Sequence, residues 1–309
     1  MRIAVMGAGG VGSYFGGMLA RSGAELTFVC RGAHLEAIRR KGLRVATPGE
    51  DFTVERISAT DDPAAVGPVD VIVQSVKLYD LASSSRMMLP MVGRQTMVLP
   101  IQNGVTAAEE IGAIAGAERV AAGMTFVNAR IESPGVVRRR SEANLLAFGE
   151  LDGRVSARVT KFRDLCVAAG IEARASENIG RDLWRKFTAV AALSAVCCLS
   201  RQPMGPIRED PALRALYVQA MKEVAALAAA KGLELEPDIV DRTLAIAQRF
   251  DYESRVSMLE DLEAGRRLEL DWLSGYVSGE ARRLGVATPF HDVAYACLKP
   301  AAGGRREQS

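Results

Sequence analysis

The segment Gly7-Ala8-Gly9-Gly10-Val11-Gly12 constrains the fold most strongly, because it follows directly on the short apolar run Arg2–Met6. Such a run is typical of a buried parallel strand. Residues 11–21 then have helical spacing, Gly23 ends that helix, and the apolar run Glu25–Cys30 predicts a second strand. The chain therefore opens with a strand–loop–helix–strand unit.

The glycines of this loop suit a bound dinucleotide. Gly7 permits a tight turn, Gly9 lets the backbone approach a pyrophosphate, and Gly12 lets the helix pack closely on the strand. The helix N-terminus adds amide groups and the positive end of a dipole. The predicted cofactor-binding residues of the loop are Gly7, Ala8, Gly9, Gly10, Val11 and Gly12. A glycine-rich turn without a ligand is the alternative, which the complete unit around the motif disfavours.

The end of the second predicted strand indicates which dinucleotide binds. NAD enzymes usually carry Asp or Glu there for the ribose 2′-hydroxyl, whereas this chain has Cys30-Arg31-Gly32. An arginine suits a 2′-phosphate, so Arg31 predicts NADPH as the cofactor. The alternative is an ordinary surface arginine near a strand end.

Two further apolar runs predict more strands of the same sheet. Val69–Val76 ends at Lys77, and Thr96–Ile101 ends at Gln102-Asn103-Gly104. Ligands of doubly wound sheets lie beyond the carboxyl ends of the strands, so we expect Lys77 and Asn103 to face the cofactor. Taken alone, a solvated loop lysine and a plain turn dipeptide are the alternatives.

The rest of the chain divides into a strand-containing part and a helical part. Residues 121–130 and 136–148 predict strands around a Ser133-Pro134-Gly135 turn, with antiparallel pairing. After about Ser176 helical spacing prevails, over 181–199, 211–231, 237–249, 268–284 and 289–298. We predict a Rossmann-type doubly wound α/β domain over residues 1–177 and an all-α substrate and dimerisation domain over 178–309, with a disordered tail from about Ala302.

Composition narrows the partners and the compartment. The formal net charge is +2, from 39 basic and 37 acidic residues, which predicts no nucleic-acid or membrane partner. Five scattered cysteines predict free thiols in a reducing compartment, and the first residues resemble a strand rather than a signal peptide, so we expect a cytoplasmic protein. His34 and His291 show no metal-ligand spacing, and we predict no metal.

One pair of charges stands in an unexpected place. Arg185 and Lys186 precede Phe187–Leu199, a run without any formal charge that predicts a buried helix. Burying an unpaired charge is costly, so each group must be paired, exposed or used.

Several motifs together resemble the ketopantoate reductase (2-dehydropantoate 2-reductase) family over nearly the whole chain. They are GAGGVG at 7–12, Arg31, VK at 76–77, QNG at 102–104, DLWRK at 182–186 and SMLEDLEAGRRLELD at 257–271. The last two blocks are specific, whereas the glycine loop is common to many families.

The resemblance implies NADPH-dependent reduction of a small 2-keto acid, foremost ketopantoate to pantoate in pantothenate biosynthesis. It implies that Lys186 is the catalytic acid that stabilises the developing oxyanion, and that Glu269 holds the substrate hydroxyl. It also implies that Ser257 contacts the substrate, that Asn103 lies by the nicotinamide and the substrate, and that Lys77 lies near the cofactor.

Each of these residues also has a structural interpretation. Lys186 could extend to solvent at a helix end, and Glu269 could be an ordinary carboxylate at a helix start. Ser257 could cap a helix, with Glu260 completing a capping box.

The chain departs from the family pattern after the lysine. Asparagines four and eight residues further on are replaced by Val190 and Ser194, and we keep Ser194 as a substrate-binding candidate. A more apolar 2-keto acid or ketone is therefore the second prediction for the substrate. A module that senses NADP(H) without catalysis is the third interpretation of the function. Separately, the apolar surface of the C-terminal helices favours a homodimer.

Overall fold

The computed structural model describes residues 1–305, which form two compact units. Met1–Gln102 and Thr106–Ile179 make up the first unit, and Asn103–Val105 joins the residues from Gly180 onward in the second. The sequence predicts this boundary between residues 177 and 178. Each unit has its own hydrophobic core.

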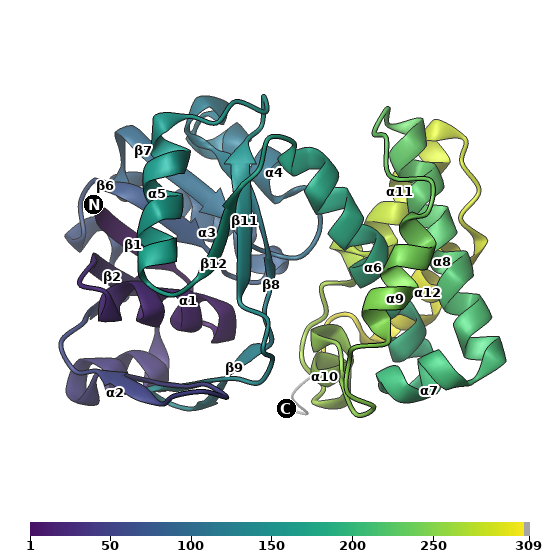
Figure 1. Cartoon of the computed structure of the whole chain (residues 1–309), viewed down its shortest axis with the longest axis horizontal. Coiled ribbons are helices and arrows are strands. Elements are labelled where there is room, and N and C mark those ends of the chain that lie inside the picture. Colours follow the sequence, from purple (N-terminus) through teal and green to yellow (C-terminus); the bar gives the residue numbers. More distant parts are fainter. Residues whose placement is uncertain (306–309) are drawn as a thin grey trace. The chain divides into compact units, whose positions relative to one another are not determined.

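A five-stranded parallel sheet in the order β5-β2-β1-β6-β7 forms the centre of the first unit (Figure 1). The strands are β1 (Arg2–Met6), β2 (Glu25–Val29), β5 (Ser58–Thr60), β6 (Val69–Gln74) and β7 (Val92–Pro100). The helices of this unit are α1 (Gly10–Arg21), α2 (Gly32–Lys41), α3 (Leu81–Met87), α4 (Ala107–Ala115) and α5 (Ala157–Ala168). β2 and β5 lie on one side of β1 and β6 and β7 on the other, so the strand order reverses at β1, and doubly wound sheets bind ligands beyond the carboxyl ends of the strands at such a point.

Two smaller sheets complete the first unit. One has the order β4-β3-β10-β9 and the other β12-β11-β8. Their strands are β3 (Leu43–Ala46), β4 (Phe52–Val54), β8 (Ala121–Phe126), β9 (Ala129–Ser133), β10 (Val136–Arg139), β11 (Leu145–Glu150) and β12 (Glu172–Ala175). The expected antiparallel pairing is confirmed for β9 with β10 and for β8 with β11. Each of the two long predicted strands is nevertheless divided, at residues 127–128 and at the polar segment 140–144.

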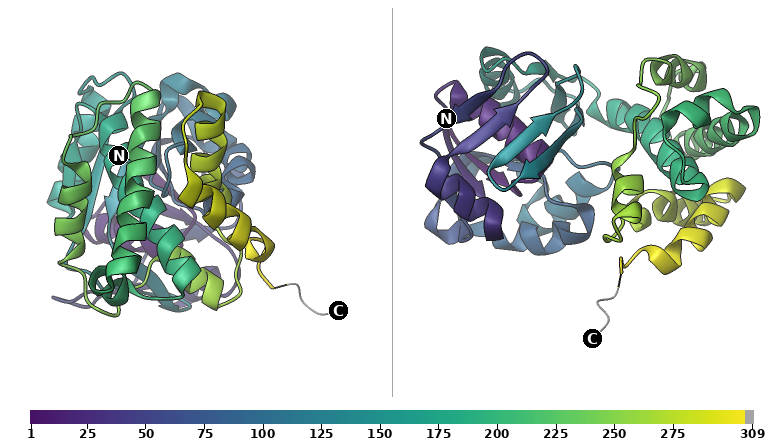
Figure 2. Two further views of the ribbon diagram at one scale, coloured as in Figure 1. Left: turned by 90° about the vertical axis from the view of Figure 1, so that its right-hand side faces the viewer. Right: turned by 90° about the horizontal axis from the view of Figure 1, so that it is seen from below.

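Every element of the second unit is a helix, as the green-to-yellow part of Figure 2 shows. The helices are α6 (Ile179–Ser200), α7 (Met204–Glu209), α8 (Pro211–Ala230), α9 (Ile239–Ala247), α10 (Ser257–Glu263), η5 (Leu270–Trp272), α11 (Ser274–Leu284), α12 (Pro289–Leu298) and η6 (Lys299–Ala301). The parallel sheet followed by helices confirms the predicted fold class. The single helix predicted over 268–284 is wrong, because the backbone leaves helical geometry at Leu273 (φ −106°, ψ −102°).

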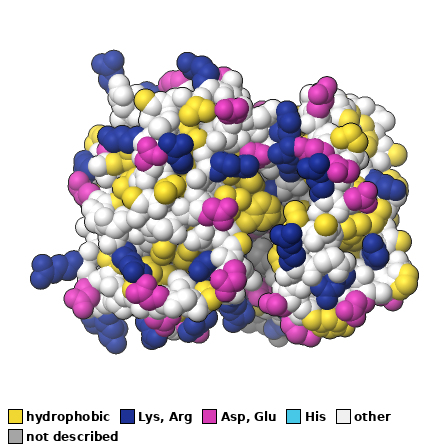
Figure 3. Space-filling view, in the orientation of Figure 1, with side chains coloured by type: hydrophobic (Ala, Val, Ile, Leu, Met, Phe, Trp, Pro, Cys, Tyr) yellow, Lys and Arg dark blue, Asp and Glu magenta, His cyan; other side chains and the backbone are white. Residues whose placement is uncertain are grey.

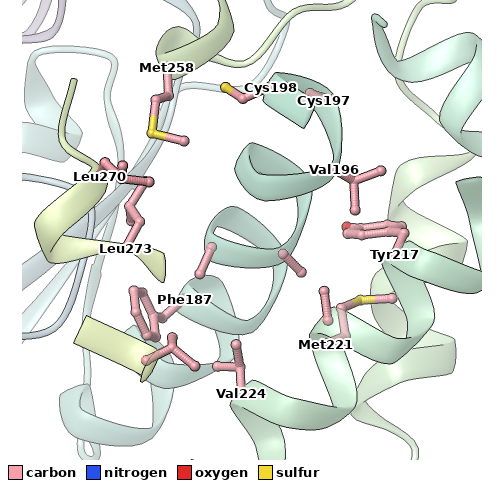
Figure 4. Packing of buried hydrophobic residues seen from close by; sticks show 14 of the residues in the cluster. Phe187, Val196, Cys197, Cys198, Tyr217, Met221, Val224, Met258, Leu270 and Leu273 are labelled. Atoms are coloured by element: carbon pink, nitrogen blue, oxygen red, sulfur yellow. The ribbon is translucent and has the colours of Figure 1, made fainter. Parts of the chain in front are cut away.

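The apolar helix α6 forms the centre of the second core. Figure 4 shows Val196 of α6 beside Tyr217 of α8, with Met221 and Val224 further along α8. Among residues 1–305, α6 is the helix long and apolar enough to cross a membrane by length and composition, yet most of it is buried within the protein. That burial is typical of a core helix of a globular domain.

The disorder predicted from Ala302 is wrong for residues 302–305. The Leu268 amide donates to the Ala302 carbonyl oxygen at 2.9 Å, and the Arg305 amide donates to that of Gly265 at 2.8 Å. Residues 306–309 lie outside the described part of the chain. On the face drawn in Figure 3, basic and acidic side chains are interspersed.

Candidate active site

The glycine loop has the geometry of a phosphate-binding turn. Gly7 has φ +95°, and a Cβ atom there would lie 2.7 Å from the Val76 side chain, so the turn requires glycine. A Cβ atom on Gly12 would lie 2.3 Å from the Gly7 carbonyl oxygen, which is the close packing expected of the third glycine. A Cβ atom on Gly9 would meet nothing within 4 Å, so this side of the loop is open.

Helix α1 begins at Gly10, directly after this open position. Its N-cap residue Gly9 supplies no side-chain hydrogen bond to the first turn, and the first turn holds no acidic residue. Amides at such a helix start attract phosphate oxygens. Gly10 itself is closely packed, because a Cβ atom there would lie 2.1 Å from the Ala129 carbonyl oxygen of β9. The loop therefore fits the pyrophosphate of a dinucleotide.

Arg31 and Lys77 follow the carboxyl ends of β2 and β6. Arg31 is the N-cap residue of α2, its side chain is 90% exposed, and its guanidinium lies 4.0 Å from the Asp80 carboxylate. A weak contact of that kind leaves the guanidinium able to bind a phosphate. Lys77 is half-buried at the start of the short helix η2 (Leu78–Asp80).

Asn103 follows β7 and belongs to the second unit by its contacts. It is half-buried, and the following Gly104 has φ +95°. The turn that ends β7 therefore requires a glycine after the asparagine.

Lys186 is a buried basic group of the second unit. It lies in the second turn of α6 and is 8% exposed, and Glu269 is 6% exposed. Burial lowers the pKa of Lys186 to about 8, while the negative charge of Glu269 acts in the opposite direction. The structure thus brings together the two residues predicted to be catalytic, although they lie 83 positions apart in the sequence. It rules out a lysine that extends to solvent.

The neighbouring Arg185 has a structural role. Its guanidinium binds the Asp182 carboxylate on the same helix at 3.0 Å, and it also pairs with Glu236. A bidentate arginine between two carboxylates anchors the start of α6. The two adjacent charges therefore differ: Arg185 is paired with carboxylates from two segments, whereas Lys186 is buried and feels the charge of Glu269.

The candidates for substrate contact differ in exposure. Ser257 is exposed and is the first residue of α10, whose N-cap is Val256 without a side-chain cap, so the capping-box interpretation of Ser257 is wrong. Ser194 is 2% exposed, two turns beyond Lys186 on α6. Val190, one turn beyond Lys186, is half-buried and packs against the second core.

Among residues 1–305, the cysteine thiols and the potential metal ligands are candidates for a second functional site. Cys166, Cys197 and Cys198 are buried free thiols, and burial raises the pKa of each to about 12. Within residues 1–305, no cluster of three or more His, Cys, Asp or Glu side chains could hold a metal ion.

The fold and these residues define a class of protein: an oxidoreductase with a nicotinamide-dinucleotide domain and a helical domain. Residues 3–153 match the family model described as ketopantoate reductase PanE/ApbA, and residues 178–302 match that of its C-terminal domain. The chain belongs to the ketopantoate reductase family, whose members are NAD(P)H-dependent oxidoreductases that act on CH–OH groups. The resemblance and the enzyme class predicted from the sequence are confirmed.

Individual relatives match nearly the whole length of this chain, but their names differ in the activity that they specify. A 2-dehydropantoate 2-reductase of Halobacterium salinarum is 32% identical over 94% of this chain and 95% of its own. The uncharacterized oxidoreductase YkpB of Bacillus subtilis is 28% identical over 97% of this chain and 98% of its own. A PanE/ApbA family ketopantoate reductase from Ralstonia eutropha JMP134 has a structure with TM-score 0.90, 31% identity and 98% coverage of both chains.

Proposed function

We propose that this enzyme reduces ketopantoate to pantoate with NADPH, a step of pantothenate biosynthesis. The observation that carries the proposal is the buried Lys186, whose pKa lies at about 8, beside the buried Glu269. An ammonium group with a pKa near neutrality can remain protonated at working pH and still give up its proton readily. Supporting the substrate assignment are the relatives named 2-dehydropantoate 2-reductase.

In the proposed reaction, the residues of the chain orient the keto acid and stabilise the charge that develops on its carbonyl oxygen. When bound, the reduced nicotinamide supplies a hydride to the carbonyl carbon of the keto acid. Negative charge then develops on the carbonyl oxygen, where Lys186 stabilises it and donates a proton. Glu269 accepts a hydrogen bond from a substrate hydroxyl and keeps Lys186 largely protonated. Asn103 and Ser257 orient the substrate, and Ser194 supports it from α6.

The proposed choice of NADPH rests on Arg31. Its exposed guanidinium follows β2, where a ribose 2′-phosphate lies in this fold. Lys77 adds a second positive charge beyond β6, which lies on the other side of β1 from β2. The amides of the glycine loop hold the pyrophosphate.

The test is the oxidation of NADPH by ketopantoate, followed by absorbance. We expect turnover with NADPH, much weaker turnover with NADH, and a loss of about 10²- to 10⁴-fold in kcat for Lys186→Ala. The matched control is Lys222→Ala, a lysine of α8. Rapid turnover by Lys186→Ala would disprove the assigned role of Lys186.

A more apolar 2-keto acid is the second candidate substrate, and Val190 favours it. Valine cannot bond a substrate hydroxyl or carboxylate, and a polar pocket discriminates strongly between such substrates. We expect Val190→Asn to raise kcat/KM for ketopantoate relative to 2-ketoisovalerate, which lacks the hydroxymethyl group. An unchanged ratio in this variant would exclude Val190 as a specificity residue.

Other sequence-based expectations stay predictions. They are a homodimer, a cytoplasmic location, and the absence of nucleic-acid and membrane partners.

A further inference from the structure

A chain of hydrogen bonds in the first unit ends on the glycine loop. The hydroxyl of the buried Ser13, on α1, donates to the Ala8 carbonyl oxygen at 2.9 Å. The Ser13 Oγ atom lies 3.2 Å from Nε2 of His34, on α2. The amide of Gly135, in the turn between β9 and β10, donates to Nδ1 of His34 at 3.0 Å.

The donors and acceptors of this chain determine the state of His34. A backbone amide can only donate, so Nδ1 of His34 carries a lone pair and the neutral ring holds its proton on Nε2. Nε2 then donates to Ser13, whose own proton is used on Ala8. Burial lowers the pKa of His34, which favours the neutral ring.

Fixing a carbonyl group also fixes the amide beyond it. The peptide unit is planar and trans, so its C=O and N–H bonds point in opposite directions. Ser13 holds the Ala8 carbonyl and thereby orients the Gly9 amide. The Ser75 hydroxyl donates to the Gly7 carbonyl at 2.6 Å and orients the Ala8 amide in the same manner.

These two consecutive amides belong to the part of the loop where a ligand can approach. The space around Gly9 is open, and α1 starts at the next residue. Oriented consecutive amides form a concave site for anions. The hydroxyls therefore act on the segment that would hold a phosphate.

We propose that His34 is a positioning residue, which orients the glycine loop through Ser13 so that the Gly9 amide faces a phosphate of the dinucleotide. His34 itself does not touch the ligand. The inference rests on the proposed cofactor site and adds two residues to it. His34 and Ser13 were not among the residues predicted from the sequence.

Two substitutions of His34 each keep one of its two hydrogen bonds, to Ser13 or from Gly135, and remove the other. In His34→Gln, the side-chain amide can reach the position of Nε2 and donate to Ser13, but the bond from Gly135 is lost. In His34→Asn, the amide oxygen occupies the position of Nδ1 and keeps the Gly135 bond, but it cannot reach Ser13. Both variants lose one of the two bonds, so a purely structural role predicts similar effects of the two.

The experiment measures the Kd for NADPH by fluorescence titration, together with the Tm of the protein without cofactor. We expect His34→Asn and Ser13→Ala to raise the Kd about tenfold, and His34→Gln to stay within about twofold of the parent protein. The matched control is Ser22→Ala, because Ser22 donates to the Leu19 carbonyl at 2.7 Å at the other end of α1. We expect this control to leave the Kd unchanged.

The possible results distinguish a failure of the positioning role of His34 from a failure of the proposed function. If the parent protein does not bind NADPH, the proposed cofactor and this inference both fail. If the parent binds NADPH but Asn and Gln at position 34 change the Kd equally, or only in proportion to Tm, the positioning role alone is disproved. An unchanged Kd in Ser13→Ala also disproves it.

Discussion

Lys186 combines burial with a neighbouring negative charge, and this combination sets the pH dependence of the proposed reaction. A proton donor must be protonated, so we expect kcat/KM to be level below its pKa and to fall as pH rises through about 8. Glu269 raises the pKa of Lys186, so Glu269→Gln should move this fall to lower pH. The measurement is kcat/KM for the keto acid between pH 6 and 10.

The control for this profile is Glu263→Gln, a carboxylate on α10 that pairs with Arg255 at the surface. This variant raises the net charge by one unit, as Glu269→Gln does, and should leave the pH profile in place. A Glu269→Gln profile that coincides with that of the parent would show that Glu269 does not influence the proton on Lys186.

Arg31 is the residue on which cofactor preference should depend. Arg31→Ala removes the guanidinium proposed for the 2′-phosphate, so we expect KM for NADPH to rise about 10- to 100-fold while KM for NADH hardly changes. Arg94→Ala is the matched control, since Arg94 is exposed near the amino end of β7. If KM for both cofactors rises equally, Arg31 acts on something other than the 2′-phosphate.

For individual residues, the sequence predicted functional roles where these depend on local spacing. The glycine loop, Arg31 and Lys77 are each defined by their position after a strand, which a pattern reveals. The bond between His34 and Gly135 joins residues 101 positions apart, and the pair of Arg185 with Glu236 spans 51. Such contacts depend on tertiary packing and have no local signature.

Among the elements, α12 has an unusual start. Its N-cap residue Thr288 makes no side-chain cap, and the Glu223 carboxylate of α8 instead accepts from the amides of Phe290 and His291, both at 3.0 Å. Glu223 is 3% exposed, so its removal leaves the part-buried amide of Phe290 and the buried amide of His291 without that partner.

We expect Glu223→Ala to lower the free energy of unfolding of the second unit by about 3 kcal/mol, because each lost bond involves a charged acceptor. Glu223→Gln keeps one acceptor atom and should cost less, about 1 kcal/mol. Urea unfolding measures both, with Glu234→Ala, an exposed glutamate, as the control. Equal stability of Glu223→Ala and Glu234→Ala would contradict a capping role for Glu223.

Among the elements, those with a continuous apolar periodicity were predictable. The helices α1, α6 and α8 lie within two residues of their predicted bounds, whereas the strands predicted over 121–130 and 136–148 are divided and the helix predicted over 268–284 is broken. The strands β3, β4 and β5 have three or four residues, and α7 and α10 six or seven, too short for a clear period. The break at Leu273 is invisible in the sequence because helical spacing continues across it.

At the scale of the whole molecule, residues 1–305 form two hydrophobic cores that share no residue. One is built from residues 3–171 and the other from helices of the second unit. Both tryptophans, Trp184 and Trp272, belong to the second unit. Tryptophan fluorescence therefore reports the unfolding of the second unit, whereas far-UV circular dichroism reports both.

This difference makes the independence of the two cores measurable with one matched pair of variants. Val71 and Val224 are 1% and 0% exposed, in the first and the second core. Replacing either with alanine removes two buried methyl groups and should cost about 2 kcal/mol, or a few degrees in the Tm of that unit. If the cores unfold independently, Val224→Ala lowers the midpoint seen by fluorescence and Val71→Ala leaves it in place. Val71→Ala then shifts only part of the circular-dichroism transition. A fluorescence midpoint that falls equally in both variants would show that the two units unfold as one cooperative body.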